Sequence, residues 1–564
     1  MRKQWNAALP YLIMAGLVTS VWGQVRPTSA TSPSQRGSVR ANKSDKEQRP
    51  QGQNGFIGYA GDVVTYHYNA ARQGQNTLET VLTPSNVNSR TFGKVAFFAM
   101  DGSIDAQPLY LYKMPIGPSL RNVLYVATEN DSLYAFDADS GAQIWKVSVA
   151  PSGETPSDEV RGCLLIYPQI GVTATPVIDR LRGPHGAIYL VAMTKDSSGN
   201  YHQRLHALDL TTGAELFGGP TEIQATYPGS GDNSQNGQVI FDPEQYAERV
   251  GLLALGGKIY LGFTSHCDYR PYTGWLMAYD ALTLVQTSVL NLTPNGDSGA
   301  IWMSGTGLAA DSQGYIYFLD GNGTFDTTLN AQGFPVNGDY GNSFMKVATS
   351  PQLAVADYFA MYNTVDESDA DEDLGSGGTM LLPDLTDSKG LVHHLAVGAG
   401  KDGNIYVVNR DNLGKFNPND DSAIYQELDG VLPGGVWAMP AYFNNTIYYG
   451  DLDGTLKAFG ITDAKLSTSP ISQTANTFSY PGTTPSVSAN GTRSGIVWAV
   501  EDSTPAVLHA YDATNLAHEL YNSNQAGSRD QFGRGNKFIT PVVVNGKVFV
   551  GTSTGVAVFG LLNH

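Results

Sequence analysis

Short runs of apolar and aromatic residues alternate with polar, turn-prone stretches along most of the chain. The clearest example is residues 123–149, which read VLYVATENDSLYAFDADSGAQIWKVSV. Within it, residues 123–128, 133–136 and 142–149 are rich in the β-branched and aromatic residues that favour strands. The joints between these runs hold Asp, Asn, Ser and Gly, which favour turns. The pattern predicts an antiparallel meander of three strands.

The same unit recurs down the chain, which is typical of a repeat protein. Most copies begin with an apolar strand, often preceded by Pro, continue with a strand that contains Tyr and end with a third strand. We therefore predict an all-β fold, an eight-bladed β-propeller, with seven blades if the fourth and fifth units share one. The units span residues 107–145, 175–217, 252–280, 307–347, 379–410, 439–459, 484–512 and 540–559.

The last unit stops after its third strand and would lack an outer strand. Residues 92–100 (FGKVAFFAM) form a strand-like run that precedes the first unit and belongs to none. Pairing this N-terminal strand with the last unit closes the ring and removes an exposed sheet edge. Residues 69–87, just before it, are interpreted as an irregular lead-in.

Composition supports this class and limits the partners. The chain of 564 residues has 63 Gly, 30 Tyr and only 15% charged residues, as expected for many strands and turns. A formal charge of −18 argues against a nucleic-acid partner, because phosphate binding needs a basic face.

The N-terminus predicts export. Residues 1–23 resemble a secretory signal peptide, with Arg2 and Lys3 before an apolar run and Gly23 at the expected cut. Residues 24–54 are rich in Ser, Pro, Gln and basic residues and are predicted to be a disordered linker. The β-propeller domain is assigned to residues 55–564. We expect a monomer, secreted or periplasmic, without a transmembrane helix in the mature chain.

The core Ala135-Phe136-Asp137, followed by Gly141 and Trp145, resembles the repeat of the pyrroloquinoline quinone (PQQ) dehydrogenases. This is the quinoprotein alcohol dehydrogenase-like superfamily, and the resemblance covers roughly residues 65–562. It implies a propeller. It does not by itself imply an activity, because non-catalytic scaffold and assembly proteins share the repeat. The chain is most similar to secreted PQQ-like propeller proteins.

Catalytic members of that superfamily hold Ca²⁺ beside the quinone with an Asn, a Glu and an Asp, and use that Asp as a general base. Asn322, in a Gly-Asn turn, is similar to the Asn ligand. Asp373 matches the Asp best and Asp371 is a further candidate metal ligand. Arg410 resembles the Arg placed against the quinone, and Trp302 resembles the Trp beneath its ring. The cofactors implied are PQQ and Ca²⁺.

Three features depart from the catalytic pattern. The dehydrogenases commonly cover the quinone with a disulfide between adjacent cysteines, and no two cysteines are adjacent here. The position expected for the Glu ligand falls near Ser198, beside Lys195, whose ammonium disfavours Ca²⁺. No Cys-x-x-Cys-His haem motif occurs, so any electron acceptor is a separate molecule.

The chain has two cysteines, Cys163 and Cys267, which fall in neighbouring predicted blades. In an oxidising compartment we expect them to form a disulfide. The alternative is a metal site that includes His266, Cys267 and Asp268, although no further ligands are evident.

Three other groups of residues have two interpretations each. The acidic run 366–373 holds six carboxylates and is either a cation site or a solvated loop. Trp437 lies just before the first strand of a unit and either faces a ligand in the central channel or belongs to the core. His206 and His509 occupy equivalent repeat positions, which indicates packing and not ligation.

Two functions remain. In the first, the propeller is a scaffold that binds an unidentified small molecule, polysaccharide or envelope protein. In the alternative, it is a Ca²⁺/PQQ-dependent dehydrogenase that oxidises an alcohol or sugar, with Asp373 as the base and Arg410 beside the quinone. The missing Glu and the missing adjacent cysteines favour the first.

Overall fold

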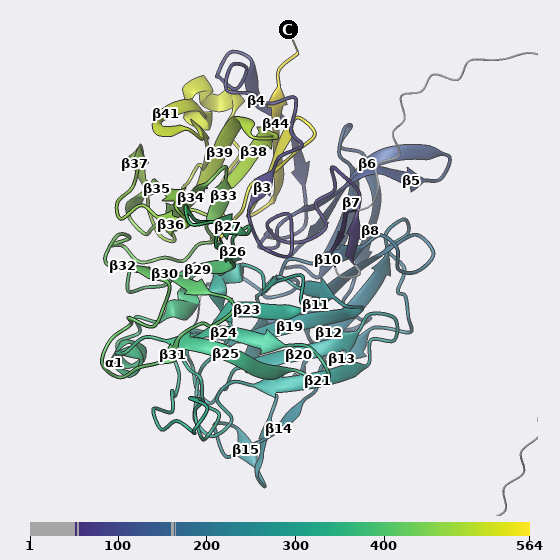
Figure 1. Ribbon diagram of the computed structural model, residues 1–564. Helices are drawn as coiled ribbons and strands as arrows, with labels where there is room; N and C mark the ends of the chain where they lie inside the picture. Colours follow the sequence, from purple (N-terminus) through teal and green to yellow (C-terminus); the bar gives the residue numbers. More distant parts are fainter. Residues whose placement is uncertain (1–50, 54–55, 159–162, 164, 564) are drawn as a thin grey trace, which may run out of the picture. The chain divides into compact units, whose positions relative to one another are not determined.

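The runs of apolar residues form eight sheets of four or five strands, almost entirely antiparallel (Figure 1). The structure is a computed structural model and describes residues 51–53, 56–158, 163 and 165–563. The predicted signal peptide and residues 24–50 of the predicted linker lie outside the described residues. All described residues fall within one unit, Gln48–His564.

Four sheets are built from the first half of the chain. In hydrogen-bonded order, their strands are β5 (Leu109–Ile116), β6 (Ser119–Ala127), β7 (Ser132–Asp137) and β8 (Gln143–Ser148); β10 (Val177–Asp179), β11 (Ala187–Lys195), β12 (Tyr201–Asp209) and β13 (Thr221–Glu222), with β9 (Thr155–Pro156) on β11; β17 (Tyr246–Glu248), β19 (Lys258–Ser265), β20 (Trp275–Asp280) and β21 (Gln286–Asn291), with β18 (Leu253–Leu255) on β19; and β22 (Ala309–Ala310), β23 (Tyr315–Leu319), β24 (Phe344–Ala348), β25 (Ala354–Ala360) and β31 (Lys415–Phe416).

The second half supplies four more sheets. Their strands are β26 (Met380–Leu381), β29 (Leu395–Ala399), β30 (Ile405–Asn409) and β32 (Gln426–Leu428); β33 (Ala441–Phe443), β34 (Thr446–Gly450), β35 (Gly454–Thr462) and β36 (Lys465–Leu466), with β37 (Ser472–Phe478) on β35; β3 (Gln75–Asn76), β38 (Ser486–Asn490), β39 (Arg493–Glu501), β40 (Val507–Asp512) and β41 (Asn515–Asn522); and β4 (Phe92–Ala99), β44 (Gly555–Leu561), β43 (Lys547–Thr552) and β42 (Val542–Val544).

Small elements complete the described part of the chain. Two hairpins and a three-stranded sheet lie outside the eight sheets, and the helical elements are all short. They are β1 (Gln51–Gln53) with β2 (Phe56–Gly58), β27 (Leu385–Thr386) with β28 (Val392–His393), β14 (Thr226–Pro228) with β16 (Gln238–Ile240) and β15 (Ser234–Gln235), α1 (Thr364–Asp369), and the 3-10 turns η1 (Met303–Gly305), η2 (Leu374–Ser376) and η3 (Ser523–Arg529). Within the described residues, no helix is long and apolar enough to cross a bilayer.

The sheets stack face to face because alternate residues of a strand point to opposite faces. In β7, Leu133 shares a buried cluster with Ile188 of β11, whereas its neighbour Tyr134 shares another with Phe549 of β43. The first sheet therefore packs against the second sheet on one face and against the last sheet on the other.

The unassigned N-terminal strand pairs with the end of the chain. β4 runs antiparallel to β44, from Phe92 opposite Leu561 to Ala99 opposite Gly555 (Figure 1). This pairing gives the last sheet its fourth strand and covers the edge of β44. The fourth and fifth predicted units form separate sheets, β22–β25 and β26–β32.

Residues 63–76, here called the axial segment, are hydrogen-bonded to all eight sheets. The sequence pattern predicted part of this segment to be an irregular lead-in, because it has neither strand nor helix periodicity. Each contact involves the strand that begins a predicted unit, here called its first strand (β5, β10, β22, β26, β33, β38 or β42), or, for Leu252, the residue just before the first strand β18. The contacts are Val63 with Tyr110, Val64 O with Ile178 N, Arg72 Nη2 with Leu252 O, Ala70 O with Ala310 N, Ala71 O with Leu381 N, Gln73 O with Tyr442 N, Gly74 O with Val487 N and Tyr68 Oη with Val543 N.

Arg72 is at the centre of these contacts and is completely buried. Its guanidinium donates to Leu308 O at 2.8 Å and to Thr65 Oγ1 and Tyr66 O at 2.7 Å. Burial lowers the pKa of Arg72 to about 9, so the side chain stays charged at neutral pH. Backbone carbonyls, not carboxylates, satisfy most of this buried charge.

We predict that Arg72→Met lowers the free energy of unfolding by about 3 kcal/mol, because it leaves buried carbonyl groups without a donor. Chemical denaturation measures this, or the thermal midpoint at a fixed scan rate if unfolding is irreversible. The matched control is Arg90→Met at an exposed position, which should change stability by less than about 0.5 kcal/mol. Equal stability of the two variants would refute the central role of Arg72.

Candidate functional site

A cavity of about 340 Å³ brings together seven of the residues singled out in the sequence: Trp302, Asn322, Asp371, Asp373, Trp437, Cys267 and Asp268. The other lining residues come from neighbouring loops and strand ends. They are Leu165, Thr264, Ser265, Tyr272, Ala300, Gly321, Lys401 and Tyr480.

The polar residues of the cavity occupy equivalent places in three consecutive sheets. Asp268 follows β19, Asn322 follows β23 and Lys401 follows β29, each in the connection from the second to the third strand of the four-strand repeat. Asp371 and Asp373 lie between α1 and η2. The repeated meander therefore delivers one polar side chain per sheet to the same place.

The acidic groups of the cavity share one ammonium group. Lys401 Nζ lies 2.6 Å from Asp373 Oδ1 and also forms an ion pair with Asp371 Oδ1. Asn322 Nδ2 donates to Asp371 Oδ1 at 2.6 Å. On the other side, Tyr272 Oη donates to Asp268 Oδ1 at 2.7 Å. Three carboxylates against one ammonium leave the cavity with an excess of negative charge.

Burial and charge oppose each other at Asp373. Burial raises the pKa of Asp373, Lys401 lowers it, and the nearby carboxylates of Asp268 and Asp371 add to the rise. For Lys401, burial alone lowers the pKa, but the ion pairs outweigh it and the net pKa is raised. The pair is thus a charged ammonium beside a carboxylate with increased basicity.

The donor set fits a hard cation in its chemistry. Carboxylate and amide oxygens are the ligands that Ca²⁺ prefers, and Asn322 Oδ1 is buried without a hydrogen-bond partner among the described residues. Within the part of the chain that the structure describes, no three His, Cys, Asp or Glu side chains are clustered closely enough to hold a metal by themselves. Asn322 and oxygens of a bound ligand would have to complete such a site.

Aromatic rings form one wall of the cavity. Trp302 meets Phe538 edge to face, with ring centroids 5.5 Å apart, and Tyr480 lies 5.8 Å from Trp437 and 6.3 Å from Phe538. Trp437, for which the sequence left two interpretations open, lines the cavity. Such a wall suits a flat or ring-shaped ligand.

Arg249 provides a buried positive charge beside this wall. Its guanidinium lies 4.6 Å above the Phe538 ring and 3.9 Å from Asp105. Nε and Nη1 have no hydrogen-bond partner in the described residues. Arg249 lines a small adjoining pocket together with Trp302, Thr264 and Ser265, which also line the main cavity. Two hydroxyls and a guanidinium with free donors are suited to an anionic group.

The structure does not bring Arg410 to this cavity. Arg410 follows the far end of β30, where it approaches Asp311 at 3.8 Å and Asp384 at 3.6 Å. Lys401 precedes the near end of the same strand. Residues at the two ends of a strand lie far apart. A resemblance to the whole strand therefore did not identify which end is near the cavity. Ser198, the expected Glu position, is an exposed turn residue outside the lining.

The predicted disulfide is present between Cys163 and Cys267, whose Cα atoms are 5.4 Å apart. His266 and Cys267 therefore do not form a metal site with a free thiol. The two repeat histidines lie outside the cavity lining, where His206 Nδ1 contacts Glu215 at 2.5 Å and His509 Nδ1 contacts Glu519 at 2.8 Å.

Sequence reasoning missed Lys401 and Arg249, and it named Asp268 only in an alternative metal site with His266 and Cys267, not beside Asn322 and Asp373. A signal for Lys401 and for this placement of Asp268 exists: aligning the units shows that Asp268, Asn322 and Lys401 all follow a second strand. In the acidic run 366–373, α1 spans residues 364–369, whereas Asp371 and Asp373 line the cavity.

The fold is similar to that of solved quinoprotein dehydrogenases. The quinohemoprotein alcohol dehydrogenase of Comamonas testosteroni has 14% sequence identity and a TM-score of 0.57, with 89% of this chain and 80% of that chain covered. A second quinohemoprotein alcohol dehydrogenase, from Pseudomonas putida HK5, has 14% sequence identity and a TM-score of 0.56, with the same coverage of both chains. A europium-containing methanol dehydrogenase has 13% sequence identity and a TM-score of 0.55, with 89% of this chain and 98% of that chain covered.

At this level of identity the similarity establishes the fold alone. The chain has a β-propeller fold similar to that of these dehydrogenases, and a propeller is the fold that its repeat predicted. No protein-family model and no curated protein sequence matches the chain.

A pH-dependent stability follows from Glu367 of α1, next to the cavity loop. Burial, with help from Asp402, raises the pKa of Glu367 to about 8. The folded state thus holds a proton that the unfolded state has lost, and stability falls as pH rises from the ordinary Glu pKa toward 8. We predict that Glu367→Gln is more stable than the wild type by about 2–4 kcal/mol at pH 9 and nearly equal to it at pH 5.

Denaturation midpoints of both proteins between pH 5 and 9 measure this difference. The control is Glu372→Gln, an exposed position in the same acidic run, for which a flat difference is expected. A Glu367→Gln difference that does not grow with pH would contradict the assignment.

Proposed function

We propose that the eight sheets are the blades of a closed eight-bladed propeller. The hydrogen bonds from the axial segment to all eight first strands support this, as does the packing of the first sheet against the last. β4 would close the ring, because it completes the last sheet from the N-terminal side.

We further propose that the protein is a Ca²⁺/PQQ-dependent dehydrogenase that oxidises an alcohol or a sugar. The observation that carries this proposal is the convergence of Asp268, Asn322 and Asp373 with Lys401 beside an aromatic wall. The sequence argument against it was the missing Glu ligand, and in this proposal Asp268 would supply a carboxylate in that role. The similarity to quinohemoprotein alcohol dehydrogenase supports the same reading through the fold.

Each part of the cavity has a place in this function. Asp268, Asn322 and Asp373 would hold the cation with oxygen atoms. Arg249, with the hydroxyls of Thr264 and Ser265, would hold carboxylate groups of the acidic cofactor, and Trp302 would contact its ring. When bound, the quinone supplies the acceptor for a hydride from the substrate.

Asp373 is the base in this proposal. Burial and the neighbouring carboxylates raise its pKa, which increases its affinity for the hydroxyl proton of the substrate. Lys401 keeps Asp373 ionised by opposing that rise, and orients the carboxylate at 2.6 Å. The surrounding aromatic side chains limit the access of water to the pair.

The binding scaffold remains the second candidate, and one observation favours it. Lys401 already pairs with both Asp371 and Asp373, so much of the negative charge is compensated without a cation. A partly neutralised cavity with an aromatic wall also suits a sugar ring of a polysaccharide. In either case we propose that the mature protein acts outside the cytoplasm, which the disulfide supports.

We predict Ca²⁺-dependent binding of PQQ by the purified protein, measured by absorbance and calorimetric titration. Asp373→Asn should weaken this binding by about a hundredfold, because it removes a charged cation ligand. With an artificial electron acceptor and a panel of alcohols and sugars, the same substitution should reduce turnover by about 10²–10⁴-fold.

Asp369→Asn is the matched control, because Asp369 is an exposed carboxylate of the same acidic run. It should leave both binding and turnover unchanged. Absence of PQQ binding at high micromolar concentration with saturating Ca²⁺ would reject the dehydrogenase and leave the scaffold.

A further inference from the structure

Asp268 reaches the cavity from residues 266–273, here called the site loop, which connects β19 and β20. Cys267 and Asp268 both have left-handed backbone conformations, with φ of 49° and 55°. Residues other than Gly rarely adopt this conformation, and two in succession need support from the surrounding structure. Contacts with the surrounding structure must therefore stabilise the loop conformation that places Asp268 at the cavity.

Electrostatics also oppose this position of Asp268. Its carboxylate interacts unfavourably with Asp373, whose pKa it helps to raise. Asp371 lines the same cavity, and only one ammonium, that of Lys401, balances the three carboxylates within the described lining. Before a cation binds, repulsion between like charges favours movement of Asp268 out of the cavity.

The hydrogen bond from Tyr272 Oη to the exposed Asp268 carboxylate opposes the repulsion, and the disulfide holds the loop backbone against both effects. Cys267 is the residue next to Asp268, and its partner Cys163 lies 104 positions earlier in the chain. The bond therefore fixes the backbone beside the carboxylate to a distant segment. A covalent tie of this kind limits how far Asp268 can retreat.

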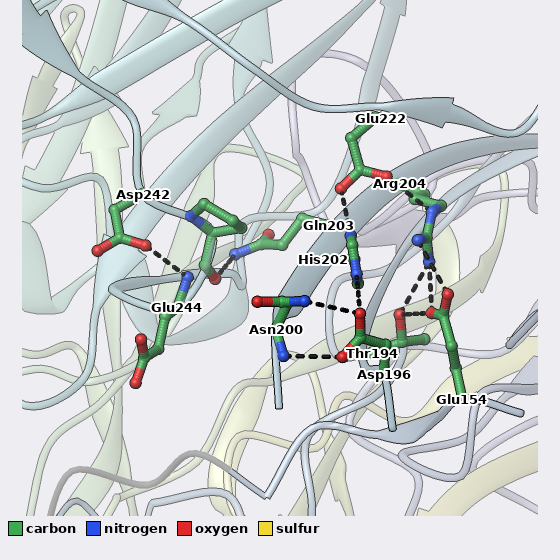
Figure 2. A network of polar contacts seen from close by, with 11 residues as sticks. Glu154, Thr194, Asp196, Asn200, His202, Gln203, Arg204, Glu222, Asp242 and Glu244 are labelled. Atoms are coloured by element: carbon green, nitrogen blue, oxygen red, sulfur yellow. Dashed lines mark hydrogen bonds and ion pairs between the residues drawn. The ribbon is translucent and has the colours of Figure 1, made fainter. Parts of the chain in front are cut away.

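The segment that carries Cys163 is itself fixed at both ends. At one end, Glu154 accepts two hydrogen bonds from Arg204, at 2.7 and 3.1 Å, and one from Thr194 at 2.5 Å (Figure 2). At the other end, Gly171 N donates to Glu129 Oε2 at 2.7 Å. Between them, Ser157 and Ile170 exchange backbone hydrogen bonds of 2.8 Å.

The charged groups around Glu154 form the network in Figure 2. Arg204 also pairs with Glu222 at 2.8 Å, and His202 lies between Glu222 and Asp196. This network belongs to β11, β12 and their neighbouring strand β13. It connects Glu154, which precedes Cys163 in the chain, to the second sheet.

We propose that the Cys163–Cys267 disulfide positions the Asp268 carboxylate in the cavity, and that its reduction weakens cation binding by releasing Asp268. This inference rests on the proposed function, because it takes the cavity to be a cation site. The disulfide is a positioning element, and the group that contacts the cation is Asp268.

The redox step balances with a dithiol as the reductant. The S–S bond accepts two electrons and two protons to give two thiols, while the dithiol becomes a cyclic disulfide. The site loop keeps other contacts after reduction. Arg270 donates to both carboxylate oxygens of Asp232, at 2.7 and 2.8 Å, and Ser298 N donates to Tyr272 O at 2.7 Å. Reduction should therefore release the part of the loop around Asp268 and leave the fold intact.

The experiment is a titration of the purified protein with Tb³⁺, a hard cation that reports binding by luminescence sensitised through nearby Trp and Tyr rings. It compares the oxidised protein, the protein treated with dithiothreitol and the Cys163→Ser/Cys267→Ser variant, all well below their melting temperatures. Reduction and the double substitution should each weaken Tb³⁺ binding by about tenfold or more. The control is Asp429→Asn, a substitution of an exposed carboxylate outside the cavity lining. It should leave the Tb³⁺ affinity of the oxidised protein and that of the reduced protein unchanged.

The Asp268→Asn background shows whether the disulfide acts through Asp268. This variant should bind Tb³⁺ weakly in the oxidised state, and reduction should weaken it no further. An equal effect of reduction in both backgrounds would overturn the role assigned to Asp268. Hydrogen exchange of residues 266–270 is a second readout that requires no cation, and it should become faster on reduction.

Two further outcomes separate this inference from the proposed function. Tb³⁺ binding that is tight in both redox states would overturn the inference and leave the cation site in place. Failure of the oxidised wild type to bind Tb³⁺ would overturn the cation site itself, and the positioning role with it.

Discussion

The buried contacts of the axial segment connect the eight sheets of the protein. Arg72 donates from one guanidinium to Thr65, Tyr66 and Leu308, and backbone groups of residues 63–76, with the side chains of Arg72 and Tyr68, form hydrogen bonds to all eight units. Each sheet alone is a small meander with apolar residues on both faces, which is stable only against its neighbours. Ordering all first strands around one segment therefore also orders the loops that build the cavity.

Two electrostatic features of the site each raise the free energy of the folded protein when no ligand is bound. The carboxylates of the cavity repel one another, and in the adjoining pocket the guanidinium of Arg249 is buried without full hydrogen bonding, with Asp105 at 3.9 Å. A ligand that carries both a cation and anionic groups would relieve both at once. The local strain at Cys267 and Asp268 fits the same view, because strained residues often occur where a site is held ready for a ligand.

The sequence predicted the all-β class and the β4 strand, because strand periodicity and turn residues are local signals, and it named several of the polar and aromatic residues of the cavity. It did not predict the axial segment, whose hydrogen bonds to the eight sheets reach distant residues and leave no periodic pattern. The resemblance covered the whole strand β30 and pointed to Arg410, which follows it, whereas the cavity is lined by Lys401, which precedes it. Asp268 was named only beside Cys267, because the search for the Glu ligand began in the preceding repeat.

The central claim is that the cavity holds a quinone and a cation together. The most direct measurement is a crystal structure of the protein soaked with PQQ and Ca²⁺. The account predicts cofactor density against Trp302, carboxylate groups near Arg249, and a cation that contacts Asp268, Asn322 and Asp373. A cavity that stays empty at saturating concentrations, with Lys401 still paired to Asp373, would contradict it.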